Sequence, residues 1–206
     1  MTIYSLYIYD RHCDCVYYQD WHRTQPLRPP SAANFKSGVH RLPPPTTNGP
    51  AARDSIFSNG SGESSIPPSG APPSRVNGDL AKVGATGGSQ KGLPFDEEAK
   101  LVYGVVLSLR NMVKKLSGKD EVFTSYRTPH YKLHLYETLT GYRFVLLSDP
   151  SSDSLRFVLR QLYTGPFVDF VVRNPLVEMD SRTTGIDNDQ FRGAVDRHMR
   201  SLSMFA

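Results

Sequence analysis

The chain is poor in the features that mark secreted, disulfide-stabilised and membrane-spanning proteins. Its 206 residues include two cysteines, Cys13 and Cys15, which lie two positions apart. On one strand they would share a face and strain a mutual disulfide, so we expect free thiols and a reducing, cytosolic compartment. No window of about 18 apolar residues occurs, which excludes a membrane-spanning helix. The start of the chain lacks the pattern of a signal peptide, and neither end has a lipidation motif.

Proline and glycine are concentrated in one part of the chain. Residues 22–94 hold 12 of the 16 prolines and 10 of the 16 glycines, but only two aromatic residues. Such a segment cannot bury enough apolar surface to offset the entropy that is lost on ordering. We therefore predict a first β-hairpin in residues 1–21, a disordered insertion in residues 22–94 and the remainder of the same domain in residues 95–206.

The positive charge of the chain arises in the same segment. The formal net charge is +4, yet residues 22–94 carry 8 Lys and Arg against 3 Asp and Glu, and the rest of the chain holds 16 basic and 17 acidic residues. A nucleic-acid-binding fold usually presents excess positive charge on its folded part. We therefore expect no nucleic acid partner.

Hydrophobic periodicity predicts an α+β domain on either side of the insertion. Apolar residues alternate or run continuously where strands are expected, and recur every three or four positions where helices are expected. Short loops with glycine or proline separate these segments. In chain order, the expected elements are strands at 3–10 and 14–19, a helix at 97–117, strands at 121–127, 131–138 and 141–149, and helices at 153–174 and 187–202.

The helix expected at 97–117 carries an unusually broad apolar surface. Asp96 is a plausible N-cap, and Lys114 and Lys115 suit the negative end of the helix dipole. Its apolar arc exceeds the stripe of about 100° that a surface helix needs, so we expect burial on more than one side. One stripe contains Leu101, Val105, Ser108 and Met112, and the other contains Val102, Val106, Leu109, Val113 and Leu116.

Gly165 and Pro166 interrupt the helical pattern of residues 153–174. Proline lacks an amide hydrogen and crowds the carbonyl four residues earlier, here that of Leu162. We therefore expect this helix to kink or to restart at the Gly-Pro pair.

The residue types that carry chemistry lack the partners that a catalytic or metal site needs. His134 has no recognisable nucleophile or orienting carboxylate, so we expect a solvated or partner-facing histidine. The Cys-x-Cys at 13–15, with His12 and His22 nearby, lacks the spacing and second ligand pair of a zinc site. No predicted strand precedes the glycine-rich stretch 84–92, as a phosphate-binding loop requires. We expect no catalytic, cofactor-binding or metal-binding residues.

Four strings occur in a familiar order along the chain. They are "YSLYIYDRHCDCVYYQDW", "AKLVYGVVLSLRNMVKKLS", "HYKLHLYETLTGYRFVLLSD" and "VDFVVRNPL". Together they resemble the subunit 1 family of the transport protein particle, TRAPP, a family of longin-like small subunits. The resemblance covers most of residues 3–21 and 94–206, and its most specific parts are residues 131–141 and 171–176.

The resemblance implies a longin-like, or profilin-like, fold: a five-stranded antiparallel sheet with one long helix on one face and two on the other. Family members are non-catalytic subunits of a vesicle-tethering complex, which acts as a nucleotide exchange factor for a Ypt/Rab GTPase in transport from the endoplasmic reticulum to the Golgi. The implied neighbours are a second longin-like subunit and an α/β-type TRAPP subunit. The implied location is cytoplasmic, peripheral at endoplasmic reticulum and cis-Golgi membranes through the complex.

Two sets of residues are predicted to meet these partners. Exchange requires tighter binding to the nucleotide-free GTPase than to the nucleotide-bound form, so the chain would supply rigid surface and no proton transfer. The helix set is Val102, Tyr103, Val106, Leu109 and Val113. The strand set is Arg127, His130, Lys132, His134 and Tyr136.

The chain departs from the family pattern at the insertion, at Gly165-Pro166 and at Cys13, which stands where the hairpin turn commonly has glycine. The cost of closing a loop grows only logarithmically with its length, so we expect the fold to accommodate the insertion. The alternatives are a small-chain adaptor of a vesicle coat and a longin-type regulatory domain of a SNARE, both of similar fold, and an independent enzyme.

Overall fold

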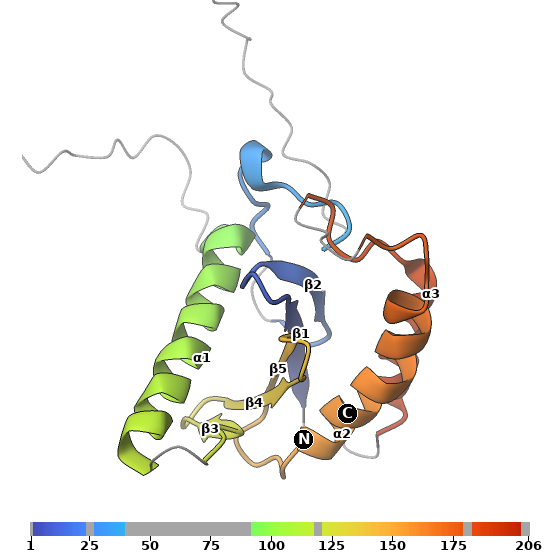
Figure 1. Ribbon diagram of the computed structural model, residues 1–206. Coiled ribbons are helices and arrows are strands. Elements are labelled where there is room, and N and C mark those ends of the chain that lie inside the picture. Colours follow the sequence, from blue (N-terminus) through green and yellow to red (C-terminus); the bar gives the residue numbers. More distant parts are fainter. Residues whose placement is uncertain (1, 24–26, 40–91, 118–120, 179–182, 203–206) are drawn as a thin grey trace, which may run out of the picture. The chain divides into compact units, whose positions relative to one another are not determined.

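A five-stranded antiparallel sheet forms the centre of the structure (Figure 1). The structure, a computed structural model, describes residues 2–23, 27–39, 92–117, 121–178 and 183–202. All of these belong to one unit, formed by residues 1–46 and 91–206. The strands are β1 (Ile3–Tyr9), β2 (Cys15–Asp20), β3 (Ser125–Arg127), β4 (Lys132–Glu137) and β5 (Arg143–Ser148), in the spatial order β2-β1-β5-β4-β3.

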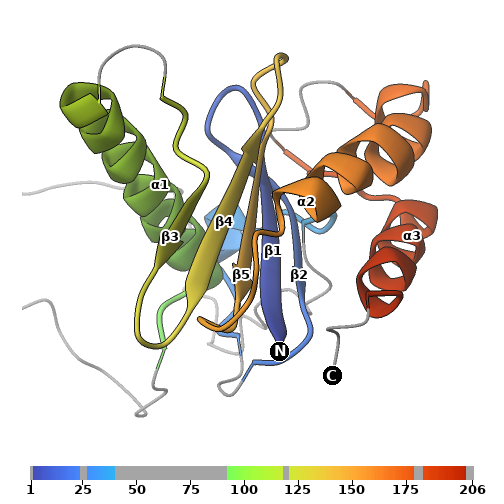
Figure 2. The same ribbon diagram turned by 90° about the horizontal axis from the view of Figure 1, so that it is seen from below.

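Helices cover both faces of this sheet, as Figure 2 shows. Helix α1 (Phe95–Ser117) lies on one face. On the other face lie α2 (Arg156–Leu162), the π-helix η2 (Tyr163–Val172) and α3 (Asp189–Arg200). A short 3₁₀ helix, η1 (Ala32–Asn34), precedes α1 in the chain. This arrangement confirms the expected α+β, longin-like fold.

Strand β1 is buried on both faces because its side chains are apolar or aromatic on both. Leu6 and Ile8 are fully buried in the core beneath α2, η2 and α3. Tyr7 and Tyr9 are buried in the core beneath α1, where the Tyr9 hydroxyl donates a hydrogen bond of 2.8 Å to the carbonyl of Ala99. The strand therefore holds both helical layers to one sheet.

Helix α1 begins two residues earlier than the capping pattern predicts. Phe95 is its first residue, so Asp96 lies inside the first turn and is not the N-cap. Asp96 instead accepts a hydrogen bond of 2.9 Å from the side-chain amide of Asn34. The buried ring of Phe95, packed 4.9 Å from that of Tyr18 between centroids, determines where the helix meets the sheet.

The helix that starts at Arg156 continues through Gly165 and Pro166 without a restart. Helical turns run from α2 directly into η2, where the turns widen to the π form. At the end of η2 the amide of Arg173 donates to the carbonyl of Val168, five residues earlier. We attribute the wider turns to Pro166, which cannot donate to the carbonyl of Leu162 and needs room beside it.

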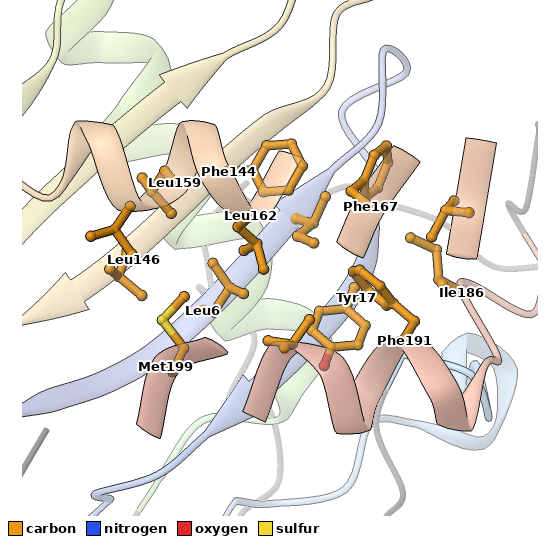
Figure 3. Packing of buried hydrophobic residues seen from close by; sticks show 14 of the residues in the cluster. Leu6, Tyr17, Phe144, Leu146, Leu159, Leu162, Phe167, Ile186, Phe191 and Met199 are labelled. Atoms are coloured by element: carbon orange, nitrogen blue, oxygen red, sulfur yellow. The ribbon is translucent and has the colours of Figure 1, made fainter. Parts of the chain in front are cut away.

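Aromatic and aliphatic side chains join this helical layer to the sheet (Figure 3). The ring of Phe167 in η2 lies 5.2 Å from that of Phe144 in β5 and 6.0 Å from that of Phe191 in α3. Leu159 and Leu162 are fully buried in the same core. Burying one such side chain contributes about 1.5–3 kcal/mol, so this face carries much of the stability of the fold.

Residues 27–39 pack against the domain, although the sequence places them in the predicted insertion. Val39 is 1% exposed, and its carbonyl accepts a 3.0 Å hydrogen bond from the amide of Tyr18 on the outer edge of β2. The amide of Gly38 donates to the carbonyl of Thr184 at 2.8 Å, and a Cβ at position 38 would collide with that oxygen. Residues 27–39 are thus part of the fold, which corrects the range of the insertion, and residues 40–91 lie outside the described residues.

The opposite edge of the sheet is formed by a shorter strand than expected. The pattern predicts a strand at 121–127, but pairing with β4 is limited to β3 and one further bond, from the amide of Leu135 to the carbonyl of Thr124. Phe123 is buried, whereas Val122 and Tyr126 are 65% and 40% exposed. This edge therefore presents apolar side chains to solvent.

Candidate interaction surface

Helix α1 has one apolar stripe that the sheet does not cover. Leu101, Met112 and Leu116 are 57%, 53% and 79% exposed, and Val105 is 40% exposed. Together with Ser108 they recur every three or four residues, so they lie along one side of the helix. We call these five residues the α1 stripe.

A hollow connects the α1 stripe to the edge strand β3. Its volume is about 400 Å³, and a Cβ placed on Gly104 at its floor would have no neighbour within 4 Å. Helix and edge strand therefore form one continuous apolar surface, of the kind that marks a protein–protein contact. The residues around the hollow are Leu101, Gly104, Val105, Ser108 and Leu109 of α1 and Tyr126 of β3.

The helix residues that we predicted to meet a partner lie instead toward the sheet. Val106 is 1% exposed in the core beneath α1. The ring of Tyr103 lies 5.3 Å from that of Tyr9, and Leu109 lies at the border between the core and the hollow. The half-buried members that pack against this core are Val102, Tyr103, Leu109 and Val113.

The sequence contains a local difference between the two sides of α1. Gly104 and Ser108 both border the hollow, and they make the side of the helix with the α1 stripe the less apolar one. The more apolar side of an amphipathic helix usually packs on its own domain. This difference is consistent with the α1 stripe being the side that the sheet leaves uncovered.

The predicted strand residues do not form one surface. Arg127 at the end of β3 and His130 in the following turn are exposed. Lys132 is half-buried, and its Nζ donates a hydrogen bond of 2.7 Å to the carbonyl of Ser152. The half-buried ring of Tyr136, on the same side of β4 as Lys132, packs against the core beneath α2, 6.2 Å from the ring of Phe144. Of this set, Arg127 and His130 lie beside the edge strand.

His134 is enclosed by polar groups of the chain itself. Its side chain is 1% exposed, and Nε2 lies 2.9 Å from Ser148 Oγ and 3.3 Å from Ser152 Oγ. Its Nδ1 accepts a hydrogen bond of 3.3 Å from the amide of Leu155, so the ring proton belongs on Nε2. Burial, together with the smaller effect of the charge of Lys132, lowers the pKa of His134 to about 4. The structure thus places His134 in the interior, and we leave it out of the interaction surface.

Acidification from pH 7 to pH 4 is expected to destabilise the domain through His134. Its pKa of about 4 in the folded state lies below the value of about 6.5 in an unfolded chain, so the unfolded state binds the proton first as pH falls. The contribution of the buried, neutral His134 to the free energy of unfolding should be fully present above pH 6.5. It should decrease by about 2–3 kcal/mol by pH 4. Urea unfolding across this range measures it. An identical pH dependence in the His134→Gln variant would contradict the assignment.

The two cysteines do not lie together on one strand. Cys15 begins β2, and burial raises the pKa of its thiol to about 12. Cys13 is exposed in the hairpin turn with a φ of +73°, a conformation that favours glycine. Its sulfur accepts a hydrogen bond of 2.8 Å from the hydroxyl of Tyr103, and both thiols are free.

A metal site and a membrane-spanning helix are both absent from the described ranges. In that part of the chain, no three His, Cys, Asp or Glu side chains are placed to hold a metal ion. No helix there has the length and apolar content to cross a membrane. The hydroxyls nearest to His134, those of Ser148 and Ser152, are themselves buried, so a substrate in solution does not reach them.

Comparison with known proteins matches residues 3–202 to the Sybindin-like family. The chain is 34% identical to "Transport protein particle subunit bet5" of Schizosaccharomyces pombe over 208 residues, which cover 100% of each chain. It is 28% identical to "Trafficking protein particle complex subunit 1" of Rattus norvegicus, over 100% of this chain and 97% of that protein. It is 30% identical to "Trafficking protein particle complex subunit BET5" of Saccharomyces cerevisiae, over 87% of this chain and 78% of that protein.

Fold and surface together define a longin-like domain with an uncovered apolar stripe beside an edge strand. The chain belongs to the Sybindin-like family. Because the family match extends from β1 to the end of α3, it includes the segments on both sides of residues 40–91.

Proposed function

We propose that the chain is a non-catalytic subunit of a TRAPP-type vesicle-tethering complex. The observation that carries this proposal is the 34% identity to the bet5 subunit of fission yeast over the whole of both chains. Because the match covers 100% of each chain, it includes α1 and the edge strand. The similarity therefore supports the same kind of role for the whole domain. The uncovered α1 stripe supports a place within an assembly.

In this proposal, the assembled complex is a nucleotide exchange factor for a Ypt/Rab GTPase in transport from the endoplasmic reticulum to the Golgi. Exchange is accelerated when the complex binds the nucleotide-free GTPase more tightly than the nucleotide-bound form. The chain contributes rigid surface to that binding and carries out no chemical step. Its location is cytoplasmic and peripheral at endoplasmic reticulum and cis-Golgi membranes, through the complex.

We assign the α1 stripe and β3 to a neighbouring subunit. A second longin-like subunit suits this surface, since an exposed sheet edge accepts a further strand while the adjacent helix buries apolar side chains. Arg127 and His130 then lie at the rim, where polar residues are usual. Contact with an α/β-type TRAPP subunit uses another part of the surface.

Replacing Leu101 and Met112 together by Asp is expected to release the chain from its neighbour while the domain stays folded. Both side chains are more than half exposed, so the charges are tolerated in the free chain. Buried in a contact, each contributes about 1.5–3 kcal/mol, so copurification of coexpressed TRAPP subunits should fall more than about tenfold. GDP release from a Ypt/Rab GTPase, measured with the reconstituted complex, should slow in parallel.

A matched control places the same two charges elsewhere on α1. Asn111→Asp with Ser117→Asp also adds two negative charges at exposed positions, and it should leave both measurements unchanged. Full copurification of the Leu101/Met112 variant would exclude the α1 stripe as the contact. Copurification of the wild-type chain with large adaptor subunits, and not with TRAPP subunits, would instead favour a small-chain adaptor.

A further inference from the structure

A second hollow lies on the other face of the sheet, between the β4–β5 turn and the start of α2. Its volume is about 740 Å³. Helix α2 lies on the side of the sheet opposite α1, so this hollow is separate from the α1 stripe (Figure 2). We call it the α2 groove. The residues that border it include Tyr136, Leu139, Arg156, Phe157, Arg160 and Tyr163.

The α2 groove carries uncompensated positive charge. Arg156 and Arg160 are both exposed and lie one helical turn apart. Within the described part of the chain, neither guanidinium has an ion-pair partner or a hydrogen-bond acceptor. The carboxylate of Glu137 also borders the groove, but it is held by Arg110 at 3.1 Å and Arg143 at 3.3 Å.

Apolar and aromatic side chains accompany this charge. Phe157 stands between the two arginines and is 67% exposed, and Leu139 in the β4–β5 turn is fully exposed. The rings of Tyr136 and Tyr163 lie 6.0 Å apart at the groove. Arginine, tyrosine and phenylalanine are the residue types most enriched at the centres of protein contacts. An exposed phenylalanine flanked by two arginines is poorly explained as a solvated helix surface.

We propose that the α2 groove binds an acidic linear segment of a partner protein. Carboxylates of the segment pair with Arg156 and Arg160, whose planar guanidinium groups suit bidentate contact. An apolar side chain of the segment packs on Phe157 beside Tyr163. The chain would then meet partners on both faces of its sheet.

Charge and shape favour this occupant over two others. Residues 40–91 carry five Lys and Arg against three Asp and Glu, so this segment has the same sign of charge as the groove. A membrane surface would be better matched by a flat basic patch than by a concave one lined with aromatic residues. Opposite charge on a partner segment would also speed its association with the groove.

The test is direct binding of a probe to the full chain. The probe is a fluorescein-labelled ten-residue peptide with six glutamates around one leucine and one phenylalanine, measured by fluorescence anisotropy. We expect saturable binding that weakens as salt is raised from 50 to 300 mM. Arg156→Gln with Arg160→Gln should weaken binding more than tenfold, and Phe157→Ala should weaken it severalfold.

The control variant is Lys114→Gln with Lys115→Gln, which removes the same charge from exposed positions on the other face. It should bind the probe like the wild type. Equal losses in the two double variants would show unspecific attraction and would overturn the proposal. Arginine-dependent binding to phosphatidylserine vesicles without binding to the peptide would also overturn it. Because the Leu101/Met112 variant keeps the α2 groove, it should bind the probe normally whether or not it assembles.

Discussion

Val106→Asp is expected to unfold the domain, whereas Val105→Asp should leave it folded. Val106 is 1% exposed beneath α1, and Val105, its neighbour in the same helix, is 40% exposed. A carboxylate at position 106 would be buried without a partner, at a cost of several kcal/mol against a total stability of about 5–15 kcal/mol. Circular dichroism during thermal unfolding measures the difference.

The pair is a matched control because the residue, the helix and the new side chain are the same at both positions. We expect the melting temperature of Val106→Asp to fall by more than about 10 °C, or the protein to be recovered unfolded, and that of Val105→Asp to change by less than about 3 °C. A folded Val106→Asp that loses its partners would restore the helix stripe predicted from the sequence. The structure argues against that outcome.

Replacing residues 40–91 by a linker of about eight Gly and Ser residues is expected to preserve the fold. Replacing residues 25–92 by the same linker should destabilise it by several kcal/mol, because this removes the buried side chain of Val39 and its hydrogen bond to Tyr18. The larger deletion also removes the contact of Gly38 with Thr184 and exposes the edge of β2. Urea unfolding of both variants measures the difference.

Two results would contradict a boundary of the fold between residues 39 and 40. Wild-type stability of both variants would mean that residues 27–39 contribute nothing to the fold. The same loss of stability in both would mean that residues 40–91, and not residues 27–39, contribute to it. If the shorter deletion also keeps copurification of TRAPP subunits, the residues replaced by the linker are dispensable for assembly.

Most of the fold could be predicted from local patterns. Strands β1, β2, β4 and β5 lie within two residues of the expected ranges because alternation and apolar runs depend on neighbouring residues alone. The predicted start of α1 was wrong by two residues, since Phe95 packs on Tyr18 and extends the helix beyond the expected cap. The π-helical continuation at Pro166 was not predicted, because a helix can kink, restart or widen its turns at a proline. Here the burial of Phe167 favours the wider turns.

The candidate interaction surface could not be predicted from local patterns in this way. Both stripes of α1 are apolar, so periodicity alone does not say which of them the sheet will cover, and Gly104 and Ser108 are a small difference between the two sides. His134 looked partner-facing because its hydrogen-bond partners, Ser148 and Ser152, lie 14 and 18 residues further along the chain. Residues 27–39 resembled the insertion in composition, yet Val39 and Gly38 find partners that are distant in sequence.

By itself, the sequence determined the order of strands and helices, the longin-like architecture and the family, because these depend on short-range periodicity and on strings that stay in register. Only the tertiary structure decided which side of α1 is uncovered, that His134 is internal and that Arg156, Phe157 and Arg160 border a groove. The physical reason is that exposure belongs to a side chain and its neighbours in space. Those neighbours are chosen when α1 and α2 pack on opposite faces of one sheet.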